Sequence, residues 1–207
     1  MAPGLFLVRR SAAAAAFGSA AVGFAAVAAA VAQSPWFSWT ENALSDLGHP
    51  SHSSQLTFNI GLMVAGLVDL WFIGNLWTQV RRNARERSAI ICLALGSLSL
   101  AFIGLFNESF GDLHFIVSGT YFAFIPVGIA LFAPAAARAD ERLGRLSLLI
   151  AVMSALLGIS ILTAIEFRTP FTSQAIPELL ASIIFGVWTC WAALLMWKGV
   201  DFRGDLT

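Results

Sequence analysis

Charged side chains are scarce in this sequence of 207 residues. Only 12% of the residues are Asp, Glu, Lys or Arg, against roughly 25% in soluble domains, whereas 58% are hydrophobic. This composition assigns the chain to the membrane class. The formal net charge is zero and no basic face or tail stands out, so we expect no nucleic-acid partner.

Cysteine and the familiar catalytic motifs are also nearly missing. Cys92 and Cys190 lie in apolar runs, where a thiol behaves as a small hydrophobic group, and they provide no disulfide framework. The zinc-binding spacing H-E-x-x-H and the nucleophile motif G-x-S-x-G do not occur. The sequence therefore carries no strong signature of a known hydrolase.

Long apolar runs are abundant. A transmembrane helix needs about 20 mostly apolar residues. Six stretches qualify, at residues 11–32, 56–79, 88–106, 113–135, 146–165 and 178–197. The first is longer than the apolar core of a cleaved signal peptide, so we expect it to remain as a span. Because the six stretches use nearly the whole chain, we predict an all-α integral membrane bundle of six transmembrane helices, with residues 1–207 in one domain of a cell-membrane protein.

The basic residues predict an orientation, since Lys and Arg favour the cytoplasmic side of short loops. If there are six spans, only Arg168 of the 12 basic residues falls on the face opposite to the others. We therefore expect both termini in the cytoplasm. Trp36 and Trp39 fall near the outer interface, where amphipathic rings are favoured.

The predicted outer face collects polar side chains, including all three histidines. They are Glu41, Asp46, Glu108, Asp112, Glu166, Glu178, His49, His52 and His114. Two of the outer connections resemble each other, because residues 42–49 read N-x3-D-L-G-H and residues 107–114 read N-x4-D-L-H. We interpret this clustering in two ways, as a functional pocket or as ordinary helix-end and turn chemistry.

Several of these polar residues could also have a purely structural role. Asp112 would cap the helix that begins near Leu113, and Ser45 or Asp46 would close a turn. Glu178 follows Pro177 in the first turn of the last helix, where the helix dipole favours an acid.

Asp69 differs from the other acids because it lies 13 residues into the second predicted span, which is roughly 20 Å along a helix. An aspartate at that depth costs about 2.5–3.5 kcal/mol to insert, so it should face the bundle interior. No Lys or Arg lies within any span to pair with it. We expect either a protonated structural residue with a hydroxyl partner such as Ser97, Ser99 or Tyr121, or a proton relay.

These residues also carry a family resemblance. The segments NALSDLGHP, FNIGLMVAGL, DLHFIVSG and AIPELLA occur in this order between Pro35 and Trp197. In this the chain resembles the bacterial and archaeal membrane family known as domain of unknown function 998. The resemblance implies a six-helix fold, loosely similar to the GPI-anchor lipid-remodelling factor and the autophagy modulator DRAM, and it implies no established reaction. Where that family often has a proline–glutamate pair before the histidine of the fourth helix, this chain has Asn107 and Glu108.

Two histidines and one or two carboxylates could hold a zinc ion with an open position for water, which would suit hydrolysis. We predict His49 and His114 as zinc ligands and Asp46 or Glu178 as a ligand or general base. Asp112 would orient a ligand. Ser45 and Tyr121 would contact the substrate. A Ser45–His49 triad and bis-histidine haem are weaker alternatives, because the motif and the helix placement that they need are missing.

The predicted function is that of a multi-pass membrane protein with an outward-facing polar pocket, in contact with membrane lipids. It could be a metal-assisted hydrolase or transferase that acts on a lipid or another amphiphile. A non-catalytic accessory protein, in which the polar groups only bond one another, is the first alternative. A proton-coupled transporter of a small molecule that uses Asp69 is the second. The oligomeric state stays open.

Overall fold

The computed structural model describes residues 3–167 and 174–204, and these are almost entirely helical. The six long helices are α1 (Pro3–Ala32), α2 (Gln55–Leu76), α3 (Ala84–Leu105), α4 (Asp112–Ala139), α5 (Glu141–Phe167) and α6 (Ala175–Trp197). Two short 3-10 helices, η1 (Ser45–Gly48) and η2 (Glu108–Phe110), lie in the connections. Each long helix contains a segment apolar and long enough to cross a membrane, which confirms the predicted all-α bundle of six spans.

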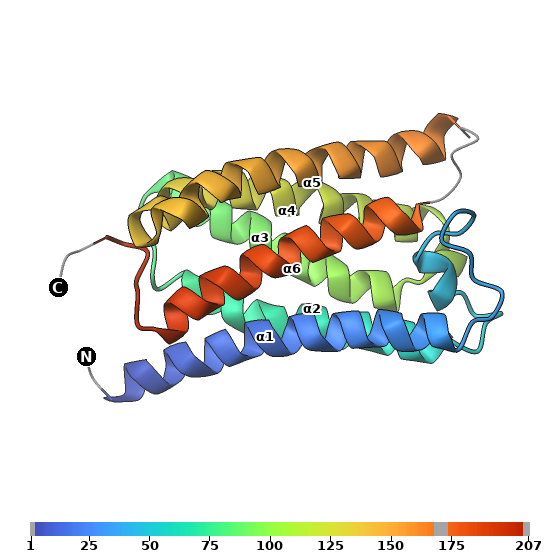
Figure 1. Cartoon of the computed structure of the whole chain (residues 1–207), viewed down its shortest axis with the longest axis horizontal. Coiled ribbons are helices and arrows are strands. Elements are labelled where there is room, and N and C mark those ends of the chain that lie inside the picture. Colours follow the sequence, from blue (N-terminus) through green and yellow to red (C-terminus); the bar gives the residue numbers. More distant parts are fainter. Residues whose placement is uncertain (1–2, 168–173, 205–207) are drawn as a thin grey trace.

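The helices form a closed ring. Each packs against its neighbours in the chain, and α6 returns to pack against α1 (Figure 1). Both termini lie at one end of the ring, here called the terminal end, and η1 and η2 lie at the other, here called the loop end (Figure 1). That the termini share an end agrees with an even number of spans. Their cytoplasmic location stays a prediction.

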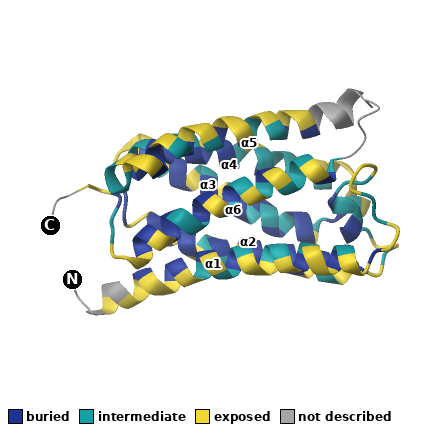
Figure 2. Ribbon diagram, viewed as in Figure 1, coloured by how far each residue is buried: buried dark blue, intermediate teal, exposed yellow. Residues whose placement is uncertain are grey.

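The outward faces of the helices are apolar. Leu67, Val152 and Val187 are each more than half exposed, at 54%, 57% and 55%. Figure 2 shows such exposed positions along the outer sides of the helices and buried positions toward the centre. A water-soluble bundle would bury these side chains, whereas hydrocarbon solvates them, so the exposure pattern fits a multi-pass membrane protein.

A small residue, Gly66, allows α2 and α3 to pack closely near Asp69. A Cβ atom added to Gly66 of α2 would lie 2.5 Å from the backbone oxygen of Ser97 and 2.5 Å from the backbone nitrogen of Ala101. The missing side chain therefore lets α3 approach α2, as small residues do between membrane helices. Because Gly66 lies about one turn from Asp69, this approach brings the Ser97 hydroxyl within reach of the Asp69 carboxyl.

Several helices begin or end outside the apolar runs that predicted them. The third span was predicted to begin at residue 88, but α3 begins at Ala84. Asn83 caps it by accepting a hydrogen bond from the Glu86 amide at 2.9 Å, and the Asn83 side chain donates to Glu86 Oε1 at 2.9 Å. The apolar length measures only the hydrocarbon crossing, and polar caps of this kind extend helices beyond it.

Ion pairs join helices at the terminal end. Arg138 of α4 contacts the carboxylate of Glu86 at 2.8 Å, and Arg9 of α1 contacts Asp201 at 3.3 Å. Helix α4 continues without interruption through Pro126 and Pro134.

Candidate functional site

A polar cavity of about 380 Å³ lies at the loop end, between η1, η2, α4 and the start of α6. The residues that line it include four acids, one histidine and two serines. They are Glu41, Ala43, Ser45, Asp46, Glu108, Gly111, His114, Phe115, Ser118, Gly119, Phe122, Ile161, Gln174 and Glu178. These residues come from segments far apart in the sequence, and we call their cavity the polar cavity.

Two hydrogen bonds tie the first connection to α6 and form one wall of the polar cavity. The Leu44 amide donates to Glu178 Oε2 at 2.7 Å, and the Ala175 amide donates to the Asn42 carbonyl at 3.1 Å. Amides at the start of a helix have no partner within it, so the Ala175 amide is satisfied by the connection. The Glu178 carboxyl is thereby held at the cavity wall.

Asp46 and Glu108 form a carboxyl pair in the same cavity. Asp46 Oδ2 accepts hydrogen bonds from Asn42 Nδ2 at 2.8 Å and from the Ala43 amide at 3.1 Å. Burial, together with the neighbouring Asp46 charge and a hydrogen bond to Asp46, raises the pKa of Glu108 to about 7. Glu108 can therefore carry a proton near neutral pH and donate it toward Asp46, which is the behaviour of two close carboxyls that share one proton.

The orientation of His114 is set by the backbone. Its Nδ1 lies 2.7 Å from the carbonyl oxygen of Phe106. A carbonyl only accepts, so Nδ1 carries the proton and in the neutral ring Nε2 is the acceptor. Nε2 lies 3.4 Å from the Ser118 hydroxyl, one turn along α4. The polar cavity therefore contains an imidazole whose basic nitrogen is available to a ligand.

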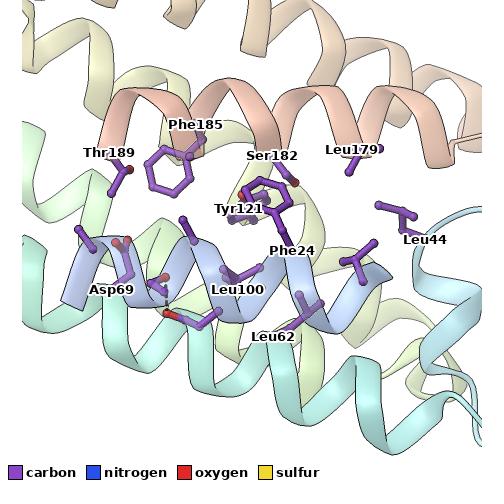
Figure 3. Close-up of a pocket in the computed structure, with 17 residues that line it drawn as sticks. Phe24, Leu44, Leu62, Asp69, Leu100, Tyr121, Leu179, Ser182, Phe185 and Thr189 are labelled. Carbon is purple, nitrogen blue, oxygen red and sulfur yellow. Dashed lines mark hydrogen bonds between the residues drawn. The ribbon is translucent and has the colours of Figure 1, made fainter. Parts of the chain in front are cut away.

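An apolar cavity continues from the polar one into the bundle. Its upper part, of about 70 Å³, shares Ser45, Ser118 and Glu178 with the polar cavity. Its lower part, also about 70 Å³, shares Leu44 and Leu62 with the upper part. Apolar side chains dominate both parts. We call the two parts together the apolar cavity, and Figure 3 shows its lower part between α1, α2 and α6.

The end of the apolar cavity opposite Leu44, here called the closed end, contains Asp69, which is only 2% exposed (Figure 3). Its Oδ2 accepts a hydrogen bond from the Ser97 hydroxyl at 2.6 Å. Its Oδ1 has no partner among the described residues. The prediction that Asp69 faces the bundle interior is confirmed by its position, and a serine hydroxyl is its partner.

Residues 6–195 match the family described as Protein of unknown function (DUF998). The chain belongs to this family. The match covers nearly the whole chain and confirms the resemblance noted from the four sequence segments. No curated protein and no solved structure matches the chain.

Most of the predicted site residues of the DUF998 protein come together. Ser45, Asp46, His114 and Glu178 line the polar cavity, and Tyr121 lines the apolar cavity. These five residues come from the first connection, α4 and α6, so the predicted convergence of separate segments is present in the fold.

Two predicted site residues lie elsewhere. His49 is not among the residues that line the polar cavity, and its Nδ1 is 2.7 Å from the Ser51 hydroxyl. Asp112 is the exposed first residue of α4 and its side chain makes no capping hydrogen bond, so the predicted cap is wrong. Gly111 occupies the cap position with a φ of 55°, a conformation that favours glycine.

The structure does not bring His49 and His114 into one cavity. Among the described residues of the DUF998 protein, no group of three or more His, Cys, Asp or Glu side chains is arranged to hold a metal ion. Zinc stays a prediction.

Sequence reasoning missed part of the site of this DUF998 protein. Glu108 was left without a role, although it forms the carboxyl pair with Asp46. On α6, Ser182 and Thr189 were also missed, and they line the apolar cavity on the same helix as the predicted Glu178. Their spacing of four and then seven residues places polar side chains on one face of an apolar helix, and this helical periodicity is the signal that could have found them.

Proposed function

We propose that this protein binds an amphiphilic molecule, with its polar group in the polar cavity and its hydrocarbon chain in the apolar cavity. The main observation in support of this proposal is that the lining changes from polar to apolar side chains between two cavities that share lining residues. Carboxyls, hydroxyls and an imidazole surround the mouth, and aliphatic and aromatic side chains surround the interior. Ligand sites in helical bundles commonly combine an apolar interior with a few polar groups.

The charge of the lining favours one class of polar group. Four acids, Glu41, Asp46, Glu108 and Glu178, line the polar cavity, and no Lys or Arg is among its described lining residues. A phosphate or carboxylate would be repelled there. An amine or a group rich in hydroxyls would find hydrogen-bond acceptors and, for the amine, favourable charge.

Binding of dodecylamine to the protein in phosphatidylcholine nanodiscs tests this proposal. We expect it to bind more tightly than dodecyl phosphate, which has the wrong charge, and than butylamine, which has too short a chain. Isothermal titration at a fixed lipid concentration would measure the affinities. Equal binding of dodecylamine and dodecyl phosphate would contradict the charge argument.

Matched variants on α3 test whether the chain occupies the apolar cavity. Leu100 lines both parts of this cavity, whereas Leu95 is exposed on the outer side of the same helix. We expect Leu100→Trp to fill the cavity and weaken dodecylamine binding about tenfold, a loss of roughly 1.4 kcal/mol. Leu95→Trp should leave it unchanged. The same affinity in both variants would place the chain elsewhere and refute the proposed binding mode.

The carboxyl pair favours a second candidate function, hydrolysis of an ester in the bound amphiphile. His114 Nε2 and the Asp46–Glu108 pair line one cavity, and the pKa of Glu108 near 7 suits a group that exchanges protons at neutral pH. We propose that His114 Nε2 takes a proton from water as the water oxygen attacks the ester carbonyl. Protonated Glu108 then donates its proton to the departing alcohol, so that an acid and an alcohol are released.

Hydrolysis of a p-nitrophenyl fatty-acid ester by the purified protein tests the second candidate. We expect His114→Gln to lower the rate by about 100-fold, within the usual contribution of general acid–base groups, and Glu108→Gln to lower it less, because p-nitrophenolate can depart without taking up a proton. His52→Gln is the matched control, because His52 stacks on Trp36 and does not line the polar cavity. A rate no higher than in empty nanodiscs would exclude this activity for the ester used.

A further inference from the structure

The closed end of the apolar cavity presents two buried oxygen atoms that have no hydrogen-bond partner among the described residues. Asp69 of α2 is 2% exposed and Thr189 of α6 is 3% exposed, and both line this cavity. Asp69 Oδ1 and Thr189 Oγ1 make no hydrogen bond within the described part of the chain. Figure 3 shows Thr189 on α6 facing Asp69 across one end of the cavity. Buried polar atoms are nearly always hydrogen-bonded, so this pair indicates a missing donor.

The other side chains at this end do not supply that donor. Ser97 donates to Asp69 Oδ2, and also contacts the Leu93 carbonyl at 3.0 Å. Ser19, which lines the same cavity, donates to the Ala65 carbonyl at 2.8 Å. Tyr121 hydrogen bonds to Ser182, nearer the loop end. The hydroxyls in reach are therefore occupied, and a ligand atom is needed to satisfy Asp69 Oδ1 and Thr189 Oγ1.

The absence of basic residues from the helices that carry Asp69 and Thr189 indicates which ligand group would suit this end of the cavity. Between residues 11 and 80, and again between 169 and 197, the sequence contains no Lys or Arg, so neither α2 nor α6 carries a cation into the bundle interior. A buried carboxylate without a cation is costly, whereas a bound ammonium group would neutralise it and provide three donors.

Aromatic rings reinforce this chemistry. Phe24, Tyr121 and Phe185 line the same part of the apolar cavity, and Figure 3 shows them between Leu44 at one end and Asp69 at the other. Aromatic faces attract cations, and they also pack well against a hydrocarbon chain. The lining therefore suits a chain that leads to an amine.

We propose that the closed end is a second binding site, in which Asp69 and Thr189 bind an amine at the far end of the amphiphile. This inference rests on the proposed function, because it assumes that the chain lies in the apolar cavity. Glu178 and Thr189 are 11 residues apart on α6, which is about 16 Å along the helix axis. The ligand class is therefore a hydrocarbon chain of roughly that length with a polar group at each end.

The test compares dodecylamine with dodecane-1,12-diamine on the intact protein in phosphatidylcholine nanodiscs. Both probes have the same chain, and only the diamine can reach the polar cavity and the closed end together. We expect the diamine to bind about tenfold more tightly or better, since charge-assisted hydrogen bonds are stronger than neutral ones. Equal affinities in the unmodified protein would overturn the second site.

Conservative variants localise the effect. Asp69→Asn keeps an oxygen that can accept from Ser97 but removes the charge, and Thr189→Val keeps the shape but removes the hydroxyl. We expect Asp69→Asn to abolish the advantage of the diamine over dodecylamine and Thr189→Val to reduce it. Asp112→Asn, at an exposed position, is the control and should keep the full advantage. A diamine advantage that survives in Asp69→Asn would refute the assignment.

The two proposals can fail separately. If neither probe binds the unmodified protein, the proposed amphiphile site is wrong and the second site falls with it. If dodecylamine binds and Leu100→Trp weakens it, but the diamine has no advantage, the amphiphile site holds and only the second site is wrong. Thermal unfolding of each variant would show that it is folded before binding is compared.

Discussion

The Leu44 amide and the Glu178 carboxylate are joined by a hydrogen bond of 2.7 Å across 134 residues of sequence. This bond holds the first connection against the start of α6. It places Glu178 in the same cavity as Asp46, which follows Leu44 in the chain by two residues. The polar cavity therefore depends on a contact between the beginning and the end of the helix ring.

We expect Glu178→Ala to lower the free energy of unfolding by about 1–3 kcal/mol, because the buried Leu44 amide would lose its acceptor. Glu178→Gln retains a carbonyl oxygen for this amide and should cost much less. Unfolding in mild detergent, followed by tryptophan fluorescence, would measure both. Equal destabilisation by the two variants would show that the charge, and not the acceptor, is what matters.

Gly66→Ala should destabilise the bundle, because the new Cβ would lie 2.5 Å from backbone atoms of α3. Backbone cannot rotate away as a flexible side chain can, so α2 and α3 would have to separate, at a cost of about 1–3 kcal/mol. Gly74→Ala, on the same helix, meets nothing within 4 Å and is the control. It should be neutral or slightly stabilising. Similar melting temperatures for both variants would be evidence against close helix packing at Gly66.

The pKa of Glu108, raised to about 7, predicts a pH dependence of stability. Between its ordinary value of 4.5 and about 7, the folded protein retains a proton that the unfolded chain has lost. The contribution of Glu108 to the free energy of unfolding is therefore greatest at acidic pH and falls as the pH rises toward 7. The other titratable groups that line the cavity with Glu108 are Glu41, Asp46, His114 and Glu178.

Melting curves of the unmodified protein and of Glu108→Gln, recorded between pH 5 and pH 8, would test this. The unmodified protein should lose stability over this range more steeply than the variant, because glutamine does not titrate. Parallel pH profiles would mean that Glu108 is not the group responsible. Asp140→Asn, at the opposite end of the bundle, is a control that should retain the steeper profile.

A buried ion pair at the terminal end should contribute more to the free energy of unfolding than an exposed one. The Glu86 side chain is only 4% exposed beside Arg138, whereas Glu141 and Arg145 are 77% and 69% exposed. We expect Arg138→Gln to cost about 3 kcal/mol, because it leaves a buried carboxylate without its cation. Arg145→Gln should change stability by less than about 1 kcal/mol. Chemical unfolding of both variants provides the comparison, and equal losses would contradict it.

The six spans could be predicted from the sequence because hydrocarbon imposes simple requirements. A segment that crosses it needs about 20 apolar residues and must satisfy its own backbone as a helix. The ends of the helices were less predictable. At the start of α3, hydrogen bonds between Asn83 and Glu86 extend the helix beyond its apolar residues, and an apolar pattern does not reveal such polar caps. The burial of Asp69 was predictable for the same reason as the spans, because no charged group faces lipid cheaply.

The partners within the polar cavity were less predictable. In the two similar motifs, Asp46 corresponds to Asp112 and His49 corresponds to His114. In the fold, the turn at Gly111 leaves Asp112 exposed, and Glu108 instead lies beside Asp46. The direction of each side chain depends on local turns that differ by a few backbone angles, and these angles are set by contacts between connections.

Composition and apolar periodicity alone were enough to establish a helical membrane protein with its histidines and many of its acids at one end, since the solvent preference of each side chain acts without regard to its neighbours. Which of those groups share a cavity was decided only when α6 closed the ring against α1 and Glu178 accepted the Leu44 amide. Hydrogen bonds act over about 3 Å, so residues far apart in the chain become partners only through the packing of the whole bundle.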